Sequence, residues 1–373
     1  MKKISKILAI VLTLALMAAL MAGCGNGNTK PNESKAPQQT GNANGGDEKE
    51  SEAPVDNTVY TLKFDYPNPE SSVAFRALTS WADYLREQSN GRLDIKIYSG
   101  GALGSLFDCV TNCESGVTDA FWSGVTIYPG VFPLTEVFGL PMIGAKSYKV
   151  INDAMNTMFE ENEELQNEWS NLHLVALHSS AGSPILFSDE ISSIKDMAGK
   201  NLRISNAYTT KWFEDHGVNP VSCGINDGYE SIQKSVIQGG LFFFDQVESS
   251  ALYEVIKSLY VGQTIYPLNM ICLNKNVYEK LPADLQQLID DSADFYLEES
   301  IKGFDEQQEN MLKVCEEHGV KILHEDEESI AWLKEGVEDA WAKWVETMNG
   351  KGYDGQAILE TAQSYIEQFN TVD

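Results

Sequence analysis

Basic residues are scarce in this chain of 373 residues, in which 27 lysines and arginines stand against 55 aspartates and glutamates and the formal net charge is -28. Proteins that bind nucleic acid concentrate lysine and arginine where phosphates approach, so the composition argues against a nucleic-acid partner. An acidic surface is typical of a soluble, non-adhesive domain. If the ligand is an anion, the overall field repels it, and a well-placed local cation must supply the attraction.

Cysteines are also few, and their pattern is incomplete. Apart from Cys24, they are Cys109, Cys113, Cys223, Cys272 and Cys315. Five is an odd number, and the spacings match no zinc motif, so the sequence predicts neither a metal site nor a complete disulfide framework. We expect buried thiols that pack as small hydrophobic residues.

Recognisable catalytic motifs are missing. The chain contains no His-Glu-x-x-His, no Gly-x-Ser-x-Gly and no Walker sequence. The glycines of residues 100–104 predict a tight turn between a strand and a helix, and the five histidines have no ligand spacing. Carboxylates are abundant, but no spacing marks a pair for glycoside chemistry. The sequence therefore predicts no cofactor and favours a binding protein over an enzyme.

One long hydrophobic run is present, from Ile7 to Met21, and it follows three lysines. A basic start, a short apolar stretch and small residues at a cut site make a secretory signal. The cysteine directly after Ala22-Gly23 is typical of a bacterial lipoprotein signal that is cleaved before Cys24, which then carries lipid. An ordinary signal peptide with a chance cysteine and a spanning helix are the alternatives. Residues 1–23 are thus predicted to be a lipoprotein signal peptide, whose removal takes three lysines and no acids and changes the net charge from -28 to -31.

Residues 24–57 follow this signal and contain almost nothing apolar. Such a segment cannot bury enough surface to offset its ordering entropy. We expect a disordered tether with a reach of roughly 30 Å. The mature protein is then extracytoplasmic and anchored by lipid to a membrane, at the cell surface or in the periplasm.

From residue 60 onward, the pattern predicts strands that alternate with helices. Strands are expected at 60–66, 93–98, 118–122, 172–177, 185–187, 201–204 and 241–244, and helices at 71–89, 105–115, 209–216, 228–238, 282–317, 327–348 and 354–369. This alternation implies βαβ units and mostly parallel sheets, arranged as two α/β lobes. The helix at 282–317 measures about 50 Å, so we expect it to run across both lobes, with a bend at Gly303. Trp332, Trp341 and Trp344 are expected to pack inward.

Several segments resemble, in order along the chain, the solute-binding proteins of TRAP transporters, of the dicarboxylate-binding (DctP) type. They are residues 87–98, 100–104, 115–120, 128–141, 194–203, 230–239 and 281–286. No single segment is decisive, but the collinear set covers nearly everything from Tyr60 to Phe369.

The resemblance implies a two-lobed α/β fold of the periplasmic-binding-protein kind, braced by a long helix. We divide it into lobe I, residues 58–175 with 268–300, and lobe II, residues 176–267 with 301–373. The implied function is to capture a small organic acid and deliver it to a TRAP-type, ion-coupled membrane permease. A lipoprotein that presents its ligand to a sensor, or an extracellular hydrolase, are the alternatives.

The family's carboxylate-binding arginine corresponds to Arg203. A guanidinium fork suits that role, because it binds a carboxylate through two parallel hydrogen bonds. A surface ion pair is the alternative for this arginine. The chain departs from the family at Gln238, where relatives carry an aspartate, and at Phe242, where some carry an asparagine. A second arginine of sugar-acid binders falls at Leu177.

At these positions the chain offers its ligand fewer polar contacts than those relatives do. This predicts a monocarboxylate ligand with an apolar or aromatic body. Phe242 and Phe244, placed on a strand, would face the same way and line an aromatic pocket, with core packing of these phenylalanines as the alternative. Further ligand-contact candidates are Trp122, Tyr208 and Ser179.

Overall fold

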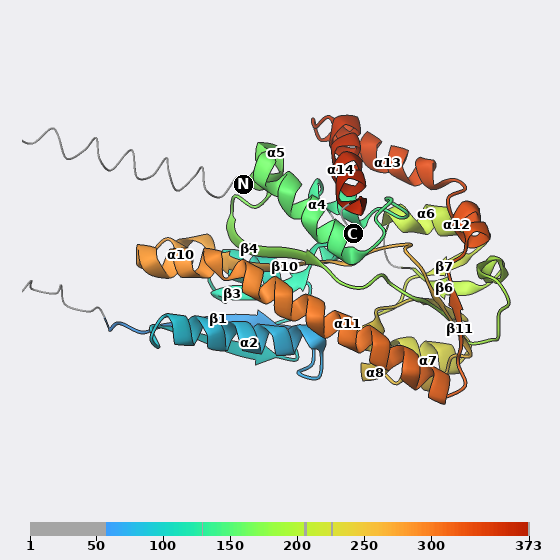
Figure 1. Ribbon diagram of the computed structural model, residues 1–373, viewed down its shortest axis with the longest axis horizontal. Helices are drawn as coiled ribbons and strands as arrows, with labels where there is room; N and C mark the ends of the chain where they lie inside the picture. The colour runs from blue at the N-terminus through green and yellow to red at the C-terminus, as the bar shows by residue number, and fades with distance from the viewer. Residues whose placement is uncertain (1–56, 129, 205–206, 225–226, 372–373) are drawn as a thin grey trace, which may run out of the picture. The chain divides into compact units, whose positions relative to one another are not determined.

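Two mixed β-sheets form the centre of the folded chain in a computed structural model that describes residues 57–128, 130–204, 207–224 and 227–371 (Figure 1). The predicted signal peptide, the lipidation site Cys24 and the tether up to residue 56 lie outside the described residues. We call each sheet, together with the helices that cover it, a lobe. The first lobe contains the sheet with β1, and the second lobe contains the sheet with β6.

The first sheet has the strand order β2-β1-β3-β10-β4. Its strands are β1 (Tyr60–Tyr66), β2 (Leu93–Ser99), β3 (Ala120–Gly124), β4 (Leu172–Ser179) and β10 (Leu268–Asn274). β1 pairs in parallel with β2 and β3, whereas β10 runs antiparallel to β3 and β4. The carboxyl ends of β1, β2 and β3 therefore lie at one edge of the sheet, which is where open α/β sheets bind ligands.

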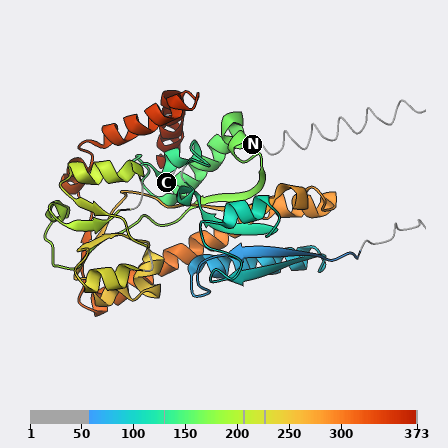
Figure 2. The ribbon, with the colours of Figure 1, turned by 180° about the vertical axis from the view of Figure 1, so that it is seen from behind.

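Both faces of the first sheet are covered by helices (Figure 2). Packed against one face are α2 (Val73–Gln88), α10 (Ala283–Asp291) and α11 (Ala293–Glu317), and against the other α3 (Cys109–Glu114), α4 (Tyr148–Glu161) and α5 (Glu163–Glu168). Successive residues of β1 point to opposite faces. Phe64 therefore joins the core beneath α2, whereas its neighbour Asp65 points to the side of α3.

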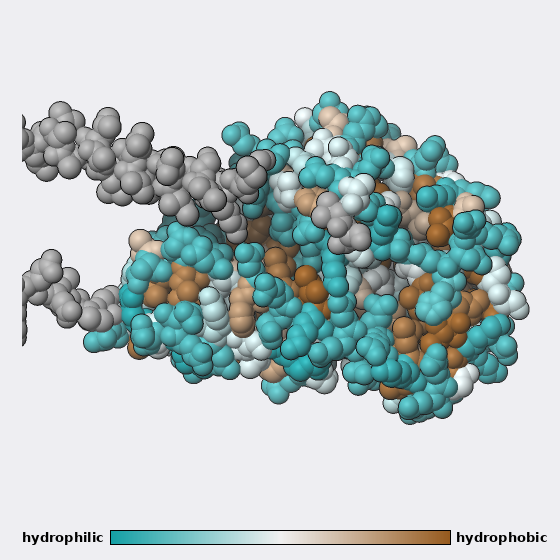
Figure 3. All heavy atoms as spheres, viewed as in Figure 1, coloured by the Kyte–Doolittle hydropathy of each residue, from teal (hydrophilic) through white to brown (hydrophobic). Residues whose placement is uncertain are grey.

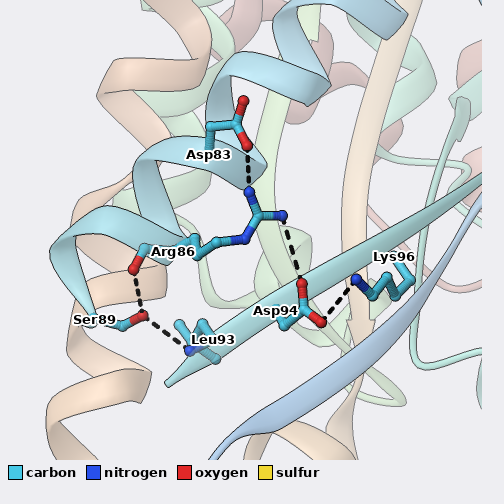
Figure 4. A network of polar contacts seen from close by, with 6 residues as sticks. All are labelled: Asp83, Arg86, Ser89, Leu93, Asp94 and Lys96. Atoms are coloured by element: carbon cyan, nitrogen blue, oxygen red, sulfur yellow. Dashed lines mark hydrogen bonds and ion pairs between the residues drawn. The ribbon is translucent and has the colours of Figure 1, made fainter. Parts of the chain in front are cut away.

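A polar network joins the end of α2 to the start of β2 (Figure 4). Arg86 donates to Asp83 at 2.6 Å and to Asp94 at 3.5 Å, and Ser89 Oγ accepts the Leu93 amide at 2.9 Å. The charged pairs are exposed and contribute little to stability. The buried serine contact fixes where the helix ends and the strand begins.

The second sheet has the order β11-β9-β5-β8-β6-β7. Its strands are β5 (Ile185–Phe187), β6 (Asn201–Arg203), β7 (Asn219–Val221), β8 (Gly239–Leu241), β9 (Ser258–Val261) and β11 (Lys321–His324). Around it lie α6 (Ala207–Asp215), α7 (Gly228–Gln233), α8 (Phe244–Ser249) and α12 (Glu327–Leu333). β6 is parallel to both β7 and β8, so these three strands end at a common edge.

Figure 3 shows hydrophobic side chains gathered over the region of α7 and β11, on a face that is otherwise largely hydrophilic.

Two antiparallel segments connect the sheets. Residues 180–184 lead from β4 to β5, and residues 262–267 lead from β9 to β10. The Ser180 amide donates to the Pro267 carbonyl at 3.3 Å, and the Ser183 amide donates to the Ile265 carbonyl at 2.9 Å. Because few hydrogen bonds join the segments, this crossing is suited to act as a hinge.

The predicted helix at 282–317 is interrupted at Ser292, which separates α10 from α11. Ser292 is fully buried, and its Oγ accepts the Trp81 indole N–H at 2.7 Å and donates to the Ile289 carbonyl at 2.6 Å. A serine that bonds backbone in this way competes with the helix ladder. α11 then continues through Gly303 and contacts α2 of the first lobe and α8 of the second, as expected for a helix that spans both lobes.

The predicted strand at 241–244 lies earlier in the chain, and this prediction was wrong. β8 covers residues 239–241, and Phe244 begins helix α8. A Cβ on Gly239 would lie 1.8 Å from the Leu186 carbonyl oxygen, and one on Gly240 would lie 2.5 Å from the Arg203 amide. The two glycines therefore form the strand, because only they allow β5 and β6 to approach this closely.

Two further predicted helices are shorter than expected. The helix predicted at 228–238 ends at Gln233, and the one predicted at 327–348 is divided into α12 and α13 (Val337–Gly350) at Gly336, whose φ is +70°. Trp344 is fully buried as expected, and Trp332 and Trp341 are partly exposed but pack against the core, also as expected.

The last two helices reach elements of both lobes. α13 packs on α6, and α14 (Gly355–Asn370) packs on α4. The division expected at residues 175 and 176 falls within β4, all of which belongs to the first sheet.

Candidate functional site

Arg203 ends β6, between β7 and β8, at the edge where the three parallel strands of the second sheet finish. Its Nε donates to the Cys223 carbonyl at 3.2 Å, and its Nη1 donates to the Leu241 carbonyl at 2.8 Å. These bonds fix the guanidinium plane. No acceptor for Nη2 is found within the described residues, so this nitrogen can donate to a ligand.

The Arg203 guanidinium is half-buried. It forms no salt bridge with a carboxylate among the described residues. Burial lowers its pKa from the ordinary value, although arginine remains charged at physiological pH. A partly desolvated cation that meets only neutral carbonyls gains much from an anionic ligand. Among the residues that the structure describes, Arg203 therefore forms no surface ion pair.

Phe242 lies against this arginine, with the Arg203 Cζ 5.1 Å from the centre of its ring. The side chain is 1% exposed. Phe244 is also buried, at the first turn of α8. Because the two residues do not share a strand, the expected common facing of their rings is not present. Phe243, which lies between them, is 41% exposed.

The carboxyl end of β1 lies close to the start of α8 in the second lobe. The Tyr66 hydroxyl, at the end of β1, hydrogen-bonds Ser72 Oγ at 2.5 Å. Burial raises the Tyr66 pKa, and the Asp245 carboxylate of α8 raises it further. Asp245 also accepts a hydrogen bond from Gln307 of α11 at 2.8 Å. The strand-end edge of the first lobe therefore faces the segment that follows β8.

Trp122 is nearly buried within the first lobe. Its indole packs edge-on against Tyr66, with ring centres 5.4 Å apart, and its Nε1 donates to His178 Nε2 at 3.3 Å. His178 is completely buried and also meets the Tyr296 hydroxyl at 3.2 Å. Burial lowers the His178 pKa to about 4, so the imidazole is neutral at pH 7 and its Nε2 accepts these bonds.

Ser179 lies at the crossing between the lobes rather than beside Arg203. Its hydroxyl donates to the Pro267 carbonyl at 2.8 Å, and its amide donates to Asn152 at 2.5 Å. The side chain is 1% exposed. This geometry favours a role for Ser179 in holding the crossing segments together.

Tyr208 follows Arg203 in α6 and approaches a buried acidic cluster. Burial and the nearby Glu136 carboxyl both raise the Tyr208 pKa. Glu136 is buried and Glu168 is half-buried, and burial raises the pKa of each to about 7. The Glu168 carboxyl accepts the Thr135 amide at 3.0 Å and the Thr135 hydroxyl at 2.9 Å. Lys351 lies near both glutamates and partly offsets their charge.

Several residues of this region were not singled out from the sequence. Asp65 is fully buried, its oxygens make no hydrogen bond of normal geometry with the described residues, and burial raises its pKa while the nearby Cys109 thiol opposes that rise. Tyr66, His178 and Glu136 were likewise missed. For Asp65 and Tyr66 the only signal in the sequence is their position at the end of a strand that was correctly predicted.

Two surface grooves lie away from Arg203. One of about 410 Å³ runs between α13, α14 and residues 142–144, and a second of about 310 Å³ adjoins His216 and Trp332. Neither contains a predicted ligand-binding residue. Within the described residues no cluster of histidine, cysteine or acidic groups could hold a metal. Among these same residues the five cysteines are unpaired, and four of them are buried.

The fold has two lobes, and a half-buried cation ends a central strand of the second lobe. The comparisons with known proteins agree. Residues 64–347 match the family model of the bacterial extracellular solute-binding proteins, family 7 (DctP). The match covers most of the chain, so the chain belongs to this family.

Relatives support the same assignment. The ectoine-binding periplasmic protein TeaA of Halomonas elongata is 22% identical over 283 residues, 73% of this chain and 81% of its own. A TRAP solute-binding protein from a marine metagenome, specific for aromatic acid ligands, was solved with 3-hydroxybenzoate. It has a TM-score of 0.77 and 23% identity, and covers 84% of this chain and 99% of its own.

A second solved structure is the TRAP solute-binding protein of Rhodoferax ferrireducens with copurified benzoate. Its TM-score is 0.75 with 22% identity, and it covers 84% of this chain and 99% of its own. These similarities establish the two-lobed fold. None of the described helices is long and apolar enough to cross a membrane.

Proposed function

We propose that this protein captures a monocarboxylate with an apolar or aromatic body between its lobes and delivers it to a TRAP-type permease. The observation that carries the proposal is the Arg203 guanidinium, which is held in place at a strand end with Nη2 directed to no protein acceptor among the described residues. An arginine held in this way binds a carboxylate with defined geometry. The solute is bound and released without turnover.

The aromatic part of the proposal rests on Phe243. It is the phenylalanine after β8 whose ring reaches solvent, and it lies next to the residues that hold Arg203. By the family resemblance, Leu177 occupies the place of a second arginine of sugar-acid binders, and Phe242 occupies a place where some relatives carry an asparagine. The solved relatives that hold 3-hydroxybenzoate and benzoate are consistent with an aromatic acid.

A thermal-shift panel tests the ligand class, because stabilisation follows RT ln(1 + [L]/Kd). Benzoate, mandelate and branched keto acids should raise the midpoint more than succinate, malate or sialic acid at equal concentration. Phe243→Leu should reduce the advantage of the aromatic acids. If a dicarboxylate or a sugar acid gives the largest shift, the aromatic ligand class is wrong while the binding function stands.

We also propose that Cys24 carries the lipid that anchors the protein outside the cytoplasm. The support is the sequence around the predicted cut site, Leu20-Met21-Ala22-Gly23-Cys24. Metabolic labelling with a fatty-acid analogue should mark the wild-type protein and leave Cys24→Ala unlabelled. Equal labelling of the two proteins would remove this assignment.

A further inference from the structure

The guanidinium of Arg203 is fixed by contacts on three sides. Backbone carbonyls of Cys223 and Leu241 accept from Nε and Nη1, and the ring of Phe242 lies under Cζ at 5.1 Å. Leu241, whose carbonyl holds Nη1, directly precedes Phe242. The last residue of β8 and the residue after it therefore supply a hydrogen-bond acceptor and an aromatic face to the same cation.

The Phe242 ring is itself held in place by Gly228, at the start of α7. A Cβ on Gly228 would lie 2.6 Å from Phe242 Cε1 and 2.9 Å from Cζ. The ring is therefore enclosed between the guanidinium and the Gly228 backbone, and it is 1% exposed. A side chain at residue 228 would displace the ring from this place, because its Cβ would lie closer to the ring atoms than van der Waals contact allows.

We infer that Phe242 is a positioning residue, which holds the Arg203 guanidinium in the orientation that receives the ligand carboxylate, and that Gly228 provides the space for it. This inference rests on the proposed carboxylate-binding role of Arg203. Cations are attracted to the face of an aromatic ring, and the attraction is stronger where water is excluded. The ring fixes the guanidinium and does not contact the body of the ligand.

A positioning role and a pocket-wall role give different selectivity. If Phe242 acts through Arg203, its loss weakens every monocarboxylate by the same factor. If Phe242 contacts the ligand body, its loss weakens aromatic acids more than aliphatic ones. Phe243, its exposed neighbour, provides a matched control for the second behaviour.

The test is calorimetric titration of benzoate and 3-methylbutanoate into wild type, Phe242→Leu, Gly228→Ala, the double variant and Phe243→Leu. Phe242→Leu should weaken both acids about tenfold and leave their ratio unchanged. Gly228→Ala should act only through the displaced ring, so it should add little in the Phe242→Leu background. A change in the benzoate to 3-methylbutanoate ratio in Phe242→Leu, or additive effects in the double variant, would overturn the inference.

A ligand-free measurement keeps the two proposals separate. The Arg203 Nε–H resonance should carry a ring-current shift that Phe242→Leu and Gly228→Ala both reduce, whereas Phe243→Leu should not. If the shift is present but no acid binds the wild type, the carboxylate-binding proposal fails and the positioning contact remains. If the shift is absent from the wild type, the positioning inference fails whatever the protein binds.

Discussion

The roles of single residues in this site depend on their structural surroundings more than on the type of residue. The position of Arg203 at the end of a strand could be predicted from the sequence, because strand-like residues precede it. The roles of Phe242 and Phe244 could not, because three consecutive phenylalanines do not reveal where a strand ends. That boundary is set by contacts of Gly239 and Gly240 with β5 and β6, which are distant in sequence.

The buried Glu136 gives a prediction for stability. Its pKa is raised from 4.5 to about 7 in the folded chain, so folding favours its protonated form. The contribution of the protonated Glu136 to the stability of the fold is fully present below pH 4.5 and is lost as the pH rises through 7. Glu136→Gln is neutral at every pH, so it should match the wild type at pH 4 and melt higher, by about 2–4 °C, at pH 8.

Thermal unfolding at both pH values measures this difference. The exposed Glu346→Gln on α13 serves as the control and should leave the difference between the two pH values unchanged. Equal midpoints for Glu136→Gln and wild type at pH 8 would show that Glu136 is already ionised without cost. Glu168, which shares the cluster and the same raised pKa, titrates together with Glu136 as one system.

Among the elements, the long helix α11 shows what sequence periodicity can and cannot establish. A helical pattern from 282 to 317 was correctly read, and so was its extension over both lobes. The interruption at Ser292 was not, because it depends on the bond from Trp81, a residue far away in sequence. Gly303, where a bend is expected, lies within α11.

Gly303 is required for close packing of α11 on α2. A Cβ there would lie 2.7 Å from Val73 Cγ1. Gly303→Ala should therefore destabilise the protein by about 1–3 kcal/mol, although alanine favours helix by about 1 kcal/mol. In a Val73→Ala background the obstructing methyl is absent, so the same substitution should become stabilising. Denaturant unfolding of the four proteins measures both effects, and destabilisation in both backgrounds would contradict the packing explanation.

The folded part of the molecule is organised around two sheets that are joined by a crossing of two segments. Alternating strands and helices predicted the two lobes, and the family resemblance predicted the brace by α11. The C-terminal helices are expected in the second lobe, and α13 packs there on α6, whereas α14 packs on α4 of the first lobe. Apolar periodicity identifies the buried side of a helix but does not identify its neighbour.

The most direct measurement of the central claim is the affinity of wild type and two Arg203 variants for the acid that gives the largest thermal shift. Loss of this cation leaves the ligand carboxylate desolvated and unpaired, so Arg203→Ala should weaken binding by roughly 2–5 kcal/mol. Arg203→Lys should also bind poorly, because the planar fork is lost. Calorimetry with wild-type affinity for either variant would show that Arg203 does not hold the solute.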